Sequence, residues 1–529
     1  MTRSYDVVVV GLGPVGATLA ALLGRAGIRT LVVERESDIQ PLPRAVALDD
    51  VALRLLQRVG VTPETGPALV TGRVLRFASA QRRAMFDLPT RQSLHGHPSV
   101  AFFHQPELES RLREELDRQE TVDVLLEHEL DDFQPASRTV LIHGRNRRTG
   151  ARFTCSCAWL VGCDGASSAV RRLAGIRLFG YTLRHRWLVV DTTGPPAVAD
   201  RPFEFICDPR RPVVSVPLPA GRHRYEFMLL PGEETVAMHA PEQVRALLAQ
   251  RLSAADLQEI EVLRASVYTL HARMAKRWRQ QRVFLAGDAA HLSPPFAGLG
   301  LSSGLRDAGN LSWKLAMVVS EQASEALLDS YETERRSDAI KLIARSVLLG
   351  TVVQPTKPAV GMARDHALRM AGKVPAVRVW AAAGAWKPRV VYRRGFVHRA
   401  AQGRARESQM PQPNVLLDDM SGRRLDDVLG MRFALVGWRI DPEACLDDLS
   451  QEFLKGLRAV LIEVRGPSPA ADRSSDVIAV RDLSGMLDEW FAQAGAPLAL
   501  LRPDGYAYAL FQPSEAPEVL RSVASALTL

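Results

Sequence analysis

The sequence predicts an α/β fold with a Rossmann-like unit at the N-terminus, an inserted and mostly antiparallel sheet, and a small α/β domain at the C-terminus. Three observations predict it. A glycine-rich turn joins two short apolar strands through a helix at residues 5–34. Strand-like segments follow one another between residues 185 and 230, separated by proline and glycine turns. Strands and helices alternate again from residue 431 to the end.

The N-terminal unit has the order strand, glycine turn, helix, strand, acid. Gly11, Gly13 and Gly16 form a G-x-G-x-x-G turn, which permits a tight bend, close approach of a pyrophosphate and close packing of helix on strand. The N-terminus of the following helix favours phosphate. Glu34 follows 18 residues after Gly16, where a carboxylate can accept a hydrogen bond from a ribose hydroxyl. The unit predicts a bound dinucleotide without distinguishing NAD from FAD.

Length and charge restrict the classes of function. A chain of 529 residues is expected to form two to four domains. Its net charge is +8, but the basic residues are dispersed and form no long run interleaved with aromatic residues. We therefore expect no nucleic-acid partner, and the positive balance favours anionic cofactors or substrates.

The cysteine pattern and the longest uncharged run indicate a cytoplasmic protein. Five cysteines are scattered without C-x-x-C spacing, which favours a reducing compartment and argues against a metal site or disulfide scaffold. Residues 7–24 carry no charge, but three glycines and a proline interrupt them. We expect neither a membrane anchor nor a signal peptide there.

The segment after Glu34 leads through Pro43, Arg44 and Ala45 to a predicted helix at 51–59. Arg44 is near enough in sequence to reach dinucleotide phosphates. Asp49 and Asp50 precede that helix, so at least one is expected to be an N-cap or dipole acid.

A second helix is predicted at 107–119, after Gln105 and Pro106. Strands are predicted at 122–126, 139–143 and 159–163, the last of which ends at Asp164 and Gly165.

The inserted sheet is predicted from the strands 187–191, 203–207, 213–217 and 225–230, followed by helices at 241–252 and 253–260 and a strand at 266–270. A buried strand at 283–286 then ends in Gly287 and Asp288. A loop with Pro295, Gly298 and Gly300 leads into a helix at 301–319. Asp288 can bind the hydroxyls of an extended ligand, and the bare backbone at the helix start favours negative charge. His291 also fits a turn histidine satisfied by the backbone.

The remaining chain is expected to hold helices at 326–346 and across 360–400, and then a linker at 404–430. From 431 to 529 a separate module has five predicted strands and three helices, without a nucleotide motif. No internal repeat is visible.

Three motifs in order carry a family resemblance: the first glycine turn with Glu34, then Cys163-Asp164-Gly165, then Gly287-Asp288 with the glycine loop after it. Over residues 4–400 the chain resembles class A FAD-dependent aromatic hydroxylases of the para-hydroxybenzoate hydroxylase fold. Within that family it is most similar to the 3-(3-hydroxyphenyl)propionate and 3-hydroxycinnamate hydroxylases. Segments such as Cys207-Asp208-Pro209 and Pro231-Gly232-Glu233 support this.

The resemblance implies a division of the chain into domains. An FAD-binding domain would comprise 1–180 with 265–345, and a substrate-binding sheet domain would comprise 73–105 with 181–264. A helical segment at 346–403 and the linker would lead to a thioredoxin-like domain at 431–529. That domain lacks C-x-x-C, so we expect a structural role or packing in a homodimer rather than redox chemistry.

The resemblance also implies FAD as cofactor and NADPH or NADH as co-substrate. A flavin C4a-hydroperoxide formed with O2 would hydroxylate a phenolic ring. Candidate catalytic residues are Asp49, Asp50, Arg224, Tyr225 and His291. The expected cofactor-binding residues are Gly11, Gly13, Pro14, Val15, Gly16, Glu34, Arg35, Arg44, Gln105, Asp164, Gly165, Gly287, Asp288, Pro295, Gly298, Gly300 and Leu301.

Four other functions remain open at this stage. The same chemistry could serve a polycyclic aromatic in a biosynthetic pathway. An NAD-dependent dehydrogenase would explain only the first motif. A flavin halogenase would carry a W-x-W-x-I-P stretch, which this sequence lacks. A non-catalytic FAD-binding protein is the fourth.

Overall fold

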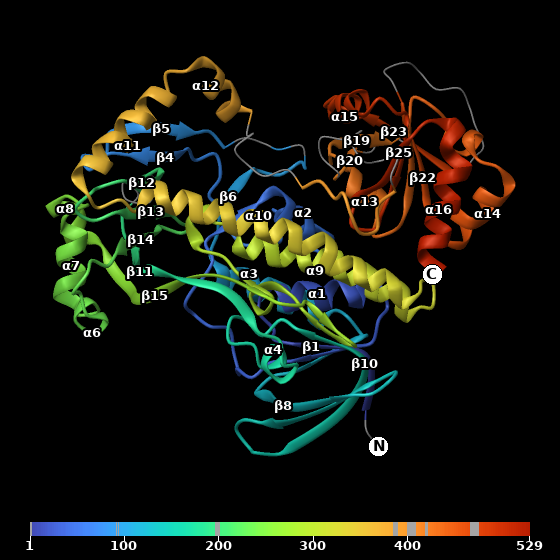
Figure 1. The fold of residues 1–529 in the computed structure, drawn as a ribbon, viewed down its shortest axis with the longest axis horizontal. Coiled ribbons are helices and arrows are strands. Elements are labelled where there is room, and N and C mark those ends of the chain that lie inside the picture. Colours follow the sequence, from blue (N-terminus) through green and yellow to red (C-terminus); the bar gives the residue numbers. More distant parts are fainter. Residues whose placement is uncertain are drawn as a thin grey trace.

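The computed structural model describes residues 3–90, 93, 95–195, 201–383, 390–398, 409–417, 422–465 and 476–528. Two sheets and their helices form the larger part of the molecule, and the C-terminal α/β domain lies beside it (Figure 1). No helix in the described ranges is both long and apolar enough to cross a lipid bilayer. The predicted fold class is confirmed: a Rossmann-like unit, an inserted sheet and a thioredoxin-like domain.

The first sheet is built around the N-terminal strand. Its order is β16-β17-β10-β1-β2-β7, with β8 and β9 added as an antiparallel extension of β10. The central strands are parallel, and Val7, Val8 and Val9 are completely buried in them. The strands are β1 (Arg3–Val10), β2 (Thr30–Val33), β7 (Val122–Leu125), β8 (His128–Pro135), β9 (Val140–Asn146), β10 (Arg152–Gly162), β16 (Arg279–Gln280) and β17 (Val283–Leu285).

Helices cover this sheet and set the positions of its loops. They are α1 (Pro14–Arg25), α3 (Gln105–Asp117), α4 (Ala169–Leu173), α9 (Gly300–Val319) and α10 (Asp329–Val353). The small ladder of β3 (Ala47–Asp49) with β6 (Val100–Phe102) leads into α2 (Asp50–Arg58). Because α1 and α9 pack on each other, the two glycine turns that precede them open toward the same space.

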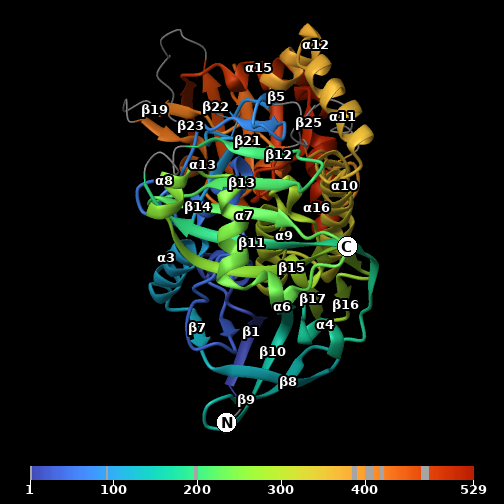
Figure 2. The ribbon, with the colours of Figure 1, turned by 90° about the vertical axis from the view of Figure 1, so that its left-hand side faces the viewer.

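The second sheet has the order β18-β15-β11-β14-β13-β12-β4-β5 and is antiparallel except for the pair β12 and β4. Its strands are β4 (Leu75–Ala78), β5 (Ala84–Leu88), β11 (Leu178–Thr193), β12 (Phe203–Ile206), β13 (Val213–Pro217), β14 (Arg222–Met228), β15 (Glu261–Ala275) and β18 (His291–Leu292). One face is covered by α6 (Thr235–Met238), α7 (Pro241–Ala249) and α8 (Ala254–Glu259) (Figure 2). The other face turns toward the first sheet and the helices α11 (Pro358–Ala371) and α12 (Pro375–Ala382).

The C-terminal sheet has the order β20-β19-β23-β22-β21-β24-β25. Strands β21, β22 and β23 are parallel, β24 runs antiparallel to β21, and β25 runs antiparallel to β24. The strands are β19 (Asn414–Leu417), β20 (Gly422–Arg424), β21 (Ala434–Trp438), β22 (Val460–Arg465), β23 (Val477–Asp482), β24 (Leu498–Leu501) and β25 (Ala507–Phe511). The helices are α13 (Leu425–Leu429), α14 (Asp448–Gly456), α15 (Met486–Ala494) and α16 (Ala516–Thr528).

Three expectations need correction. The predicted linker is partly structured, because β19, β20 and α13 add to the C-terminal sheet before residue 431. Strand β8 was not predicted, because its sequence His128–Pro135 has only two buried side chains and two acids in its middle. Residues 390–398 were expected to be helical but form no helix, and 384–389 and 399–403 lie outside the described residues.

Two buried clusters of paired charged side chains connect the C-terminal domain to the rest of the molecule. In the first, Asp426 accepts hydrogen bonds from Arg54 and from Arg58, both on α2. In the second, Glu334 on α10 pairs with Arg502 and with Lys314. These side chains are almost completely buried, so each cluster holds the domains in one relative position.

Candidate functional site

A cavity of about 1020 Å³ lies between the carboxyl ends of the first sheet and the inner face of the second. The turns after β1, β2, β10 and β17 form one wall. The second sheet and the helices α10 to α12 form the other wall. Except for Gly16, all the residues expected to bind the cofactor line this cavity, so three motifs far apart in sequence meet at one place.

The first motif forms a narrow corner in the cavity wall. Gly11 has a φ of +103°, which favours glycine, and a Cβ on Gly16 would lie 2.0 Å from the Gly11 carbonyl oxygen. A Cβ on Gly13, by contrast, would meet no atom of the described residues within 4 Å. The Leu12 amide donates to Glu34 Oε2 at 2.7 Å. Among the described residues no side chain caps the start of α1, so its N–H groups face an open space.

The second motif contributes the carboxylate of Asp164 to the cavity wall. Asp164 Oδ2 accepts hydrogen bonds from the amides of Ala169 at 2.6 Å and Val170 at 3.1 Å, which fixes the start of α4. Asp164 Oδ1 is buried and has no hydrogen-bond partner among the described residues. A buried acceptor without a partner is costly, so this oxygen indicates a missing donor in the cavity.

The third motif supplies an acid and a bare helix start. Asp288 follows β17 and is exposed to the cavity, and the protein around it raises the pKa of Asp288, mainly by desolvation. Within the part of the chain that the structure describes, helix α9 begins at Gly300 without a side-chain cap, and a Cβ there would meet no atom within 4 Å. The N–H groups of the first turn are therefore open to a ligand with partial negative charge.

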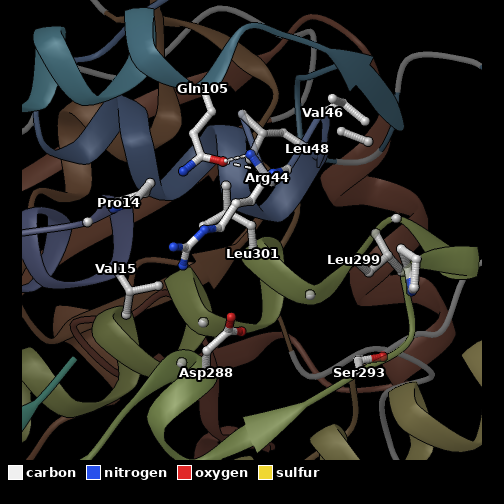
Figure 3. Close-up of a pocket in the computed structure, with 18 of the residues that line it drawn as sticks. Pro14, Val15, Arg44, Val46, Leu48, Gln105, Asp288, Ser293, Leu299 and Leu301 are labelled. Atoms are coloured by element: carbon white, nitrogen blue, oxygen red, sulfur yellow. Dashed lines mark hydrogen bonds between the residues drawn. The ribbon is translucent and has the colours of Figure 1, made fainter. Parts of the chain in front are cut away.

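The loop with Arg44 closes the cavity from the opposite side. Gln105 Oε1 accepts from the amides of Arg44 at 3.0 Å and Ala45 at 2.7 Å. Behind the loop, Arg224 donates to the carbonyl oxygens of Pro43 and Arg44. The backbone of Arg44 is thus fixed, and its side chain extends toward Asp288 (Figure 3).

The five candidate catalytic residues do not line the cavity. Asp49 caps α2 through the Ala52 amide and pairs with Arg306, and Asp50 is buried at the first position of that helix. These two acids therefore lie at a helix start, as the sequence predicted for at least one of them, and neither lines the cavity.

The other three candidate catalytic residues also make contacts within the protein. His291 Nε2 lies 2.8 Å from Asp307 Oδ2, so the partner of this histidine is a carboxylate rather than the backbone. Arg224 is paired with Asp191. Tyr225 packs against the helices on the outer face of the second sheet. Tyr225 is placed there because successive side chains of a strand alternate between faces.

Among the cavity residues that the sequence prediction missed, two lie close to the second wall and carry a charge. Glu226 on β14 and Arg345 on α10 both line the cavity. Glu226 lies beside the predicted Arg224 and Tyr225, and the alternation of the strand could have placed it on the inner face with Arg224. Arg345 carried no local signal, because only the packing of α10 over the loop at Pro295–Ala297 brings it to the cavity.

Comparison with known proteins identifies the family. Residues 4–346 match the family described as FAD binding domain, and residues 408–526 match the HcaD C-terminal domain. The chain is 36% identical to the 3-(3-hydroxy-phenyl)propionate/3-hydroxycinnamic acid hydroxylases of Escherichia coli and Shigella sonnei. The alignment of 536 residues covers 100% of this chain and 96% of each relative.

Solved structures have the same fold. The flavin-dependent monooxygenase PieE, in complex with FAD and substrate, matches with a TM-score of 0.81 at 21% identity over 99% of both chains. The p-nitrophenol 4-monooxygenase PnpA of Pseudomonas putida matches with a TM-score of 0.66 at 26% identity, over 73% of this chain and 98% of that one.

The chain therefore belongs to the FAD-binding-domain family. It is a flavin-dependent aromatic hydroxylase with FAD as its cofactor, and NAD(P)H is the co-substrate typical of this family. An NAD-dependent dehydrogenase is not favoured, because the matched family binds FAD. The cavity fits FAD: Gly13 and Gly300 leave room beside bare helix starts, and Asp164 Oδ1 offers an unpaired acceptor.

Proposed function

We propose that this enzyme hydroxylates a phenolic ring that carries a short anionic side chain, such as 3-(3-hydroxyphenyl)propionate, with NADPH or NADH and O2. The relatives named for that substrate are 36% identical over the whole chain, which supports the substrate class. One observation carries the proposal: a single cavity joins the three glycine and aspartate motifs to an apolar face of the second sheet.

The residues that would hold FAD follow from the geometry of the first wall. Gly13 and the start of α1 would receive the pyrophosphate together with Arg44, and Glu34 would accept from the adenosine ribose. Asp288 would bind the ribityl chain, and the amides at the start of α9 would face the pyrimidine edge of the flavin. When bound, FAD supplies the hydride acceptor and the centre at which O2 is activated.

The second wall excludes water from the reaction. Phe77, Phe205 and Phe296 line it, and Leu349 and Val352 of α10 cover it. A phenol held there loses its water shell, which strengthens every electrostatic interaction made with it. The wall also keeps water from competing with the substrate for activated oxygen.

Identification of the product from a panel of phenols tests this function. The purified holoenzyme is supplied with NADPH or NADH, O2 and one phenol at a time, and products are identified by mass spectrometry. We expect a substituted single-ring phenol with a carboxylate side chain to give a hydroxylated product. Exclusive turnover of polycyclic phenols would contradict the substrate class, and no turnover of any phenol would contradict the function.

Arg345 is expected to recognise the carboxylate of the substrate. It lines the cavity and has no ion-pair or hydrogen-bond partner among the described residues. Replacing Arg345 by methionine keeps an unbranched side chain but removes the guanidinium and its charge, so the KM for 3-(3-hydroxyphenyl)propionate should rise about 10-fold with little change in kcat. Steady-state kinetics measure both constants.

The matched control for Arg345 is Lys341→Met, an exposed position on the same helix that does not line the cavity. It should leave both constants unchanged. Neutral 3-propylphenol should show equal KM values with the wild type and Arg345→Met. An equal rise in KM for the neutral phenol would show that Arg345 affects the shape of the cavity and does not recognise the carboxylate of the substrate.

We also propose a cytoplasmic location and a homodimer. All five cysteines are free thiols, which supports a reducing compartment. Met362 on α11 and Val379 on α12 are 67% and 69% exposed, which supports burial of this surface in a second copy. Light scattering coupled to gel filtration measures the mass, and a monomer at micromolar concentration would contradict the dimer.

A further inference from the structure

Where it lines the cavity, the described part of the second sheet's inner face is apolar apart from one residue. Strands β4, β5, β12, β13 and β14 contribute nine side chains to the cavity, and Glu226 is the only one of these nine with a polar side chain. It lies on β14, and no hydrogen-bond partner for it is found in the described part of the chain. An apolar wall with a single polar group fixes the orientation of a ligand at that group.

The strand registers place Glu226 at the end of the part of a straight row that lines the cavity. Glu226 pairs with Val214, Val214 with Phe205, Phe205 with Phe77, and Phe77 with Phe86. Neighbouring strands are about 4.8 Å apart, so Val214 is the immediate neighbour of Glu226 and Phe205 lies two strands away, at about 9.6 Å. An aromatic substrate that packs on this row can direct a hydroxyl toward Glu226.

The charges behind Glu226 are already paired with one another. Asp191 on β11, Arg224 on β14 and Arg264 on β15 form a buried ion cluster, in which Arg224 Nε donates to Asp191 Oδ1 at 2.6 Å. Both arginines also donate to the Pro43 carbonyl oxygen. This cluster leaves Glu226 without a partner of its own, so the carboxyl group is available to the cavity.

We propose that Glu226 is a catalytic residue that accepts the proton of the substrate's phenolic hydroxyl. The O–H bond of the phenol breaks, the proton goes to a Glu226 carboxylate oxygen, and the electron pair remains on the phenolic oxygen. The resulting phenolate has more electron density at its ortho and para carbons, where the incoming oxygen atom must bond. This assignment rests on the proposed function, because it requires a phenolic substrate.

The surroundings of Glu226 suit it to this transfer. Burial raises the pKa of Glu226, Arg224 and Arg264 lower it in part, and Asp191 raises it, with a net increase. A higher pKa brings the carboxylate closer to the pKa of a phenol, which is about 10, and so makes it a stronger base. As the pH falls below the pKa of Glu226, its carboxyl group is protonated and can no longer accept the proton.

The test is the pH dependence of hydroxylation by Glu226→Gln holoenzyme. Glutamine keeps the shape of the side chain but cannot take a proton. Product formation from 3-(3-hydroxyphenyl)propionate at neutral pH should fall about 100-fold, at the lower end of the range for general base catalysis. The rate should recover as the pH rises toward the pKa of the phenol. Phenols that are already ionised at the assay pH, such as nitrophenols, should lose less than 5-fold.

Asp87→Asn is the matched control, because Asp87 lies on the same sheet, pairs with Arg76 and does not line the cavity. It should keep the wild-type profile. Flavin absorption shows that each variant retains FAD, and the phenolate absorption of the bound substrate reports its ionisation directly.

Two outcomes would overturn the role of Glu226. One is a hydroxylation rate for Glu226→Gln that keeps a constant ratio to the wild-type rate at every pH. The other is an equal loss for neutral and ionised phenols, which would show that Glu226 only shapes the cavity. If the wild type itself hydroxylates no phenol, the proposed function fails instead.

Discussion

Replacing Glu334 by alanine is expected to lower the free energy of unfolding by roughly 3–5 kcal/mol, because it removes the carboxylate that two buried cations share. Glu334 accepts from Arg502 at 2.9 Å through each oxygen and from Lys314 at 2.9 Å, and all three side chains are completely buried. Its Oε1 also accepts from the Phe396 amide at 2.8 Å. Urea unfolding of the FAD-loaded protein, followed by circular dichroism, measures the loss.

The pH dependence of stability provides an independent check. Pairing with Arg502 and Lys314 lowers the pKa of Glu334 to about 2, although burial alone would raise it. The unfolded value for glutamate is about 4.3, so the stabilisation is fully present above that pH and is lost as the pH falls toward 2. Glu334→Ala should therefore lose less stability than the wild type over this acid range.

Lys314 should make stability change with pH in a second range, at high pH. Burial and the nearby Arg502 outweigh the pairing with Glu334 and lower the pKa of Lys314 to about 8. Between about pH 8 and 10.4 the unfolded lysine binds more protons than the folded one, so this group makes stability rise with pH there.

An exposed glutamate serves as the control for Glu334. Glu325 pairs with Arg282 at 2.6 Å but is 52% exposed, so Glu325→Ala should change stability by less than about 1 kcal/mol. If Glu334→Ala had an equally small effect, the buried cluster would not be what fastens the C-terminal domain to α10.

The difference between these two glutamates also shows where sequence patterns stop being informative. Both lie within ten residues of each other near the start of the same helical segment. Glu334 meets Arg502 only because the C-terminal domain packs against α10, and 168 residues separate the two partners. No local pattern encodes a contact of that range, and the same holds for the pairing of Arg54 with Asp426.

The three glycine and aspartate motifs of the first cavity wall were predictable because each is a local structure. A glycine that must have a positive φ, or whose Cβ would strike the backbone, is required by the turn in which it lies, as at Gly11 and Gly16. The order strand, turn, helix places each motif at the carboxyl end of a parallel strand. Parallel strands share that edge, so the three motifs meet there.

The second wall of the cavity, formed by the second sheet, was not predictable in the same way. Its character comes from registers between five strands, which pair through turns and a parallel contact between β4 and β12. Glu226 becomes the single polar group of a row only when these registers are known. The sequence instead drew attention to Arg224 and Tyr225, one of which holds the Arg44 loop while the other faces the opposite side.

Replacing Gly13 by valine is expected to give a folded protein that has lost FAD. Gly13 has extended backbone angles, which valine adopts readily, and a Cβ there would meet no atom of the protein within 4 Å. The added methyl groups would instead occupy the space where a pyrophosphate approaches the start of α1. We expect FAD affinity to fall at least ~100-fold, equivalent to about 2.7 kcal/mol, measured by flavin fluorescence on titration.

Gly16→Val separates loss of the ligand site from loss of the fold. A Cβ at Gly16 would lie 2.0 Å from the Gly11 carbonyl oxygen, so the strand and helix must move apart before any ligand is considered. That variant should lose both FAD and thermal stability, whereas Gly13→Val without FAD should melt at the temperature of the wild-type apoprotein. Equal FAD affinity in Gly13→Val and the wild type would mean that the pyrophosphate does not approach α1. The site would then have to be rebuilt around Asp288 and the start of α9 alone.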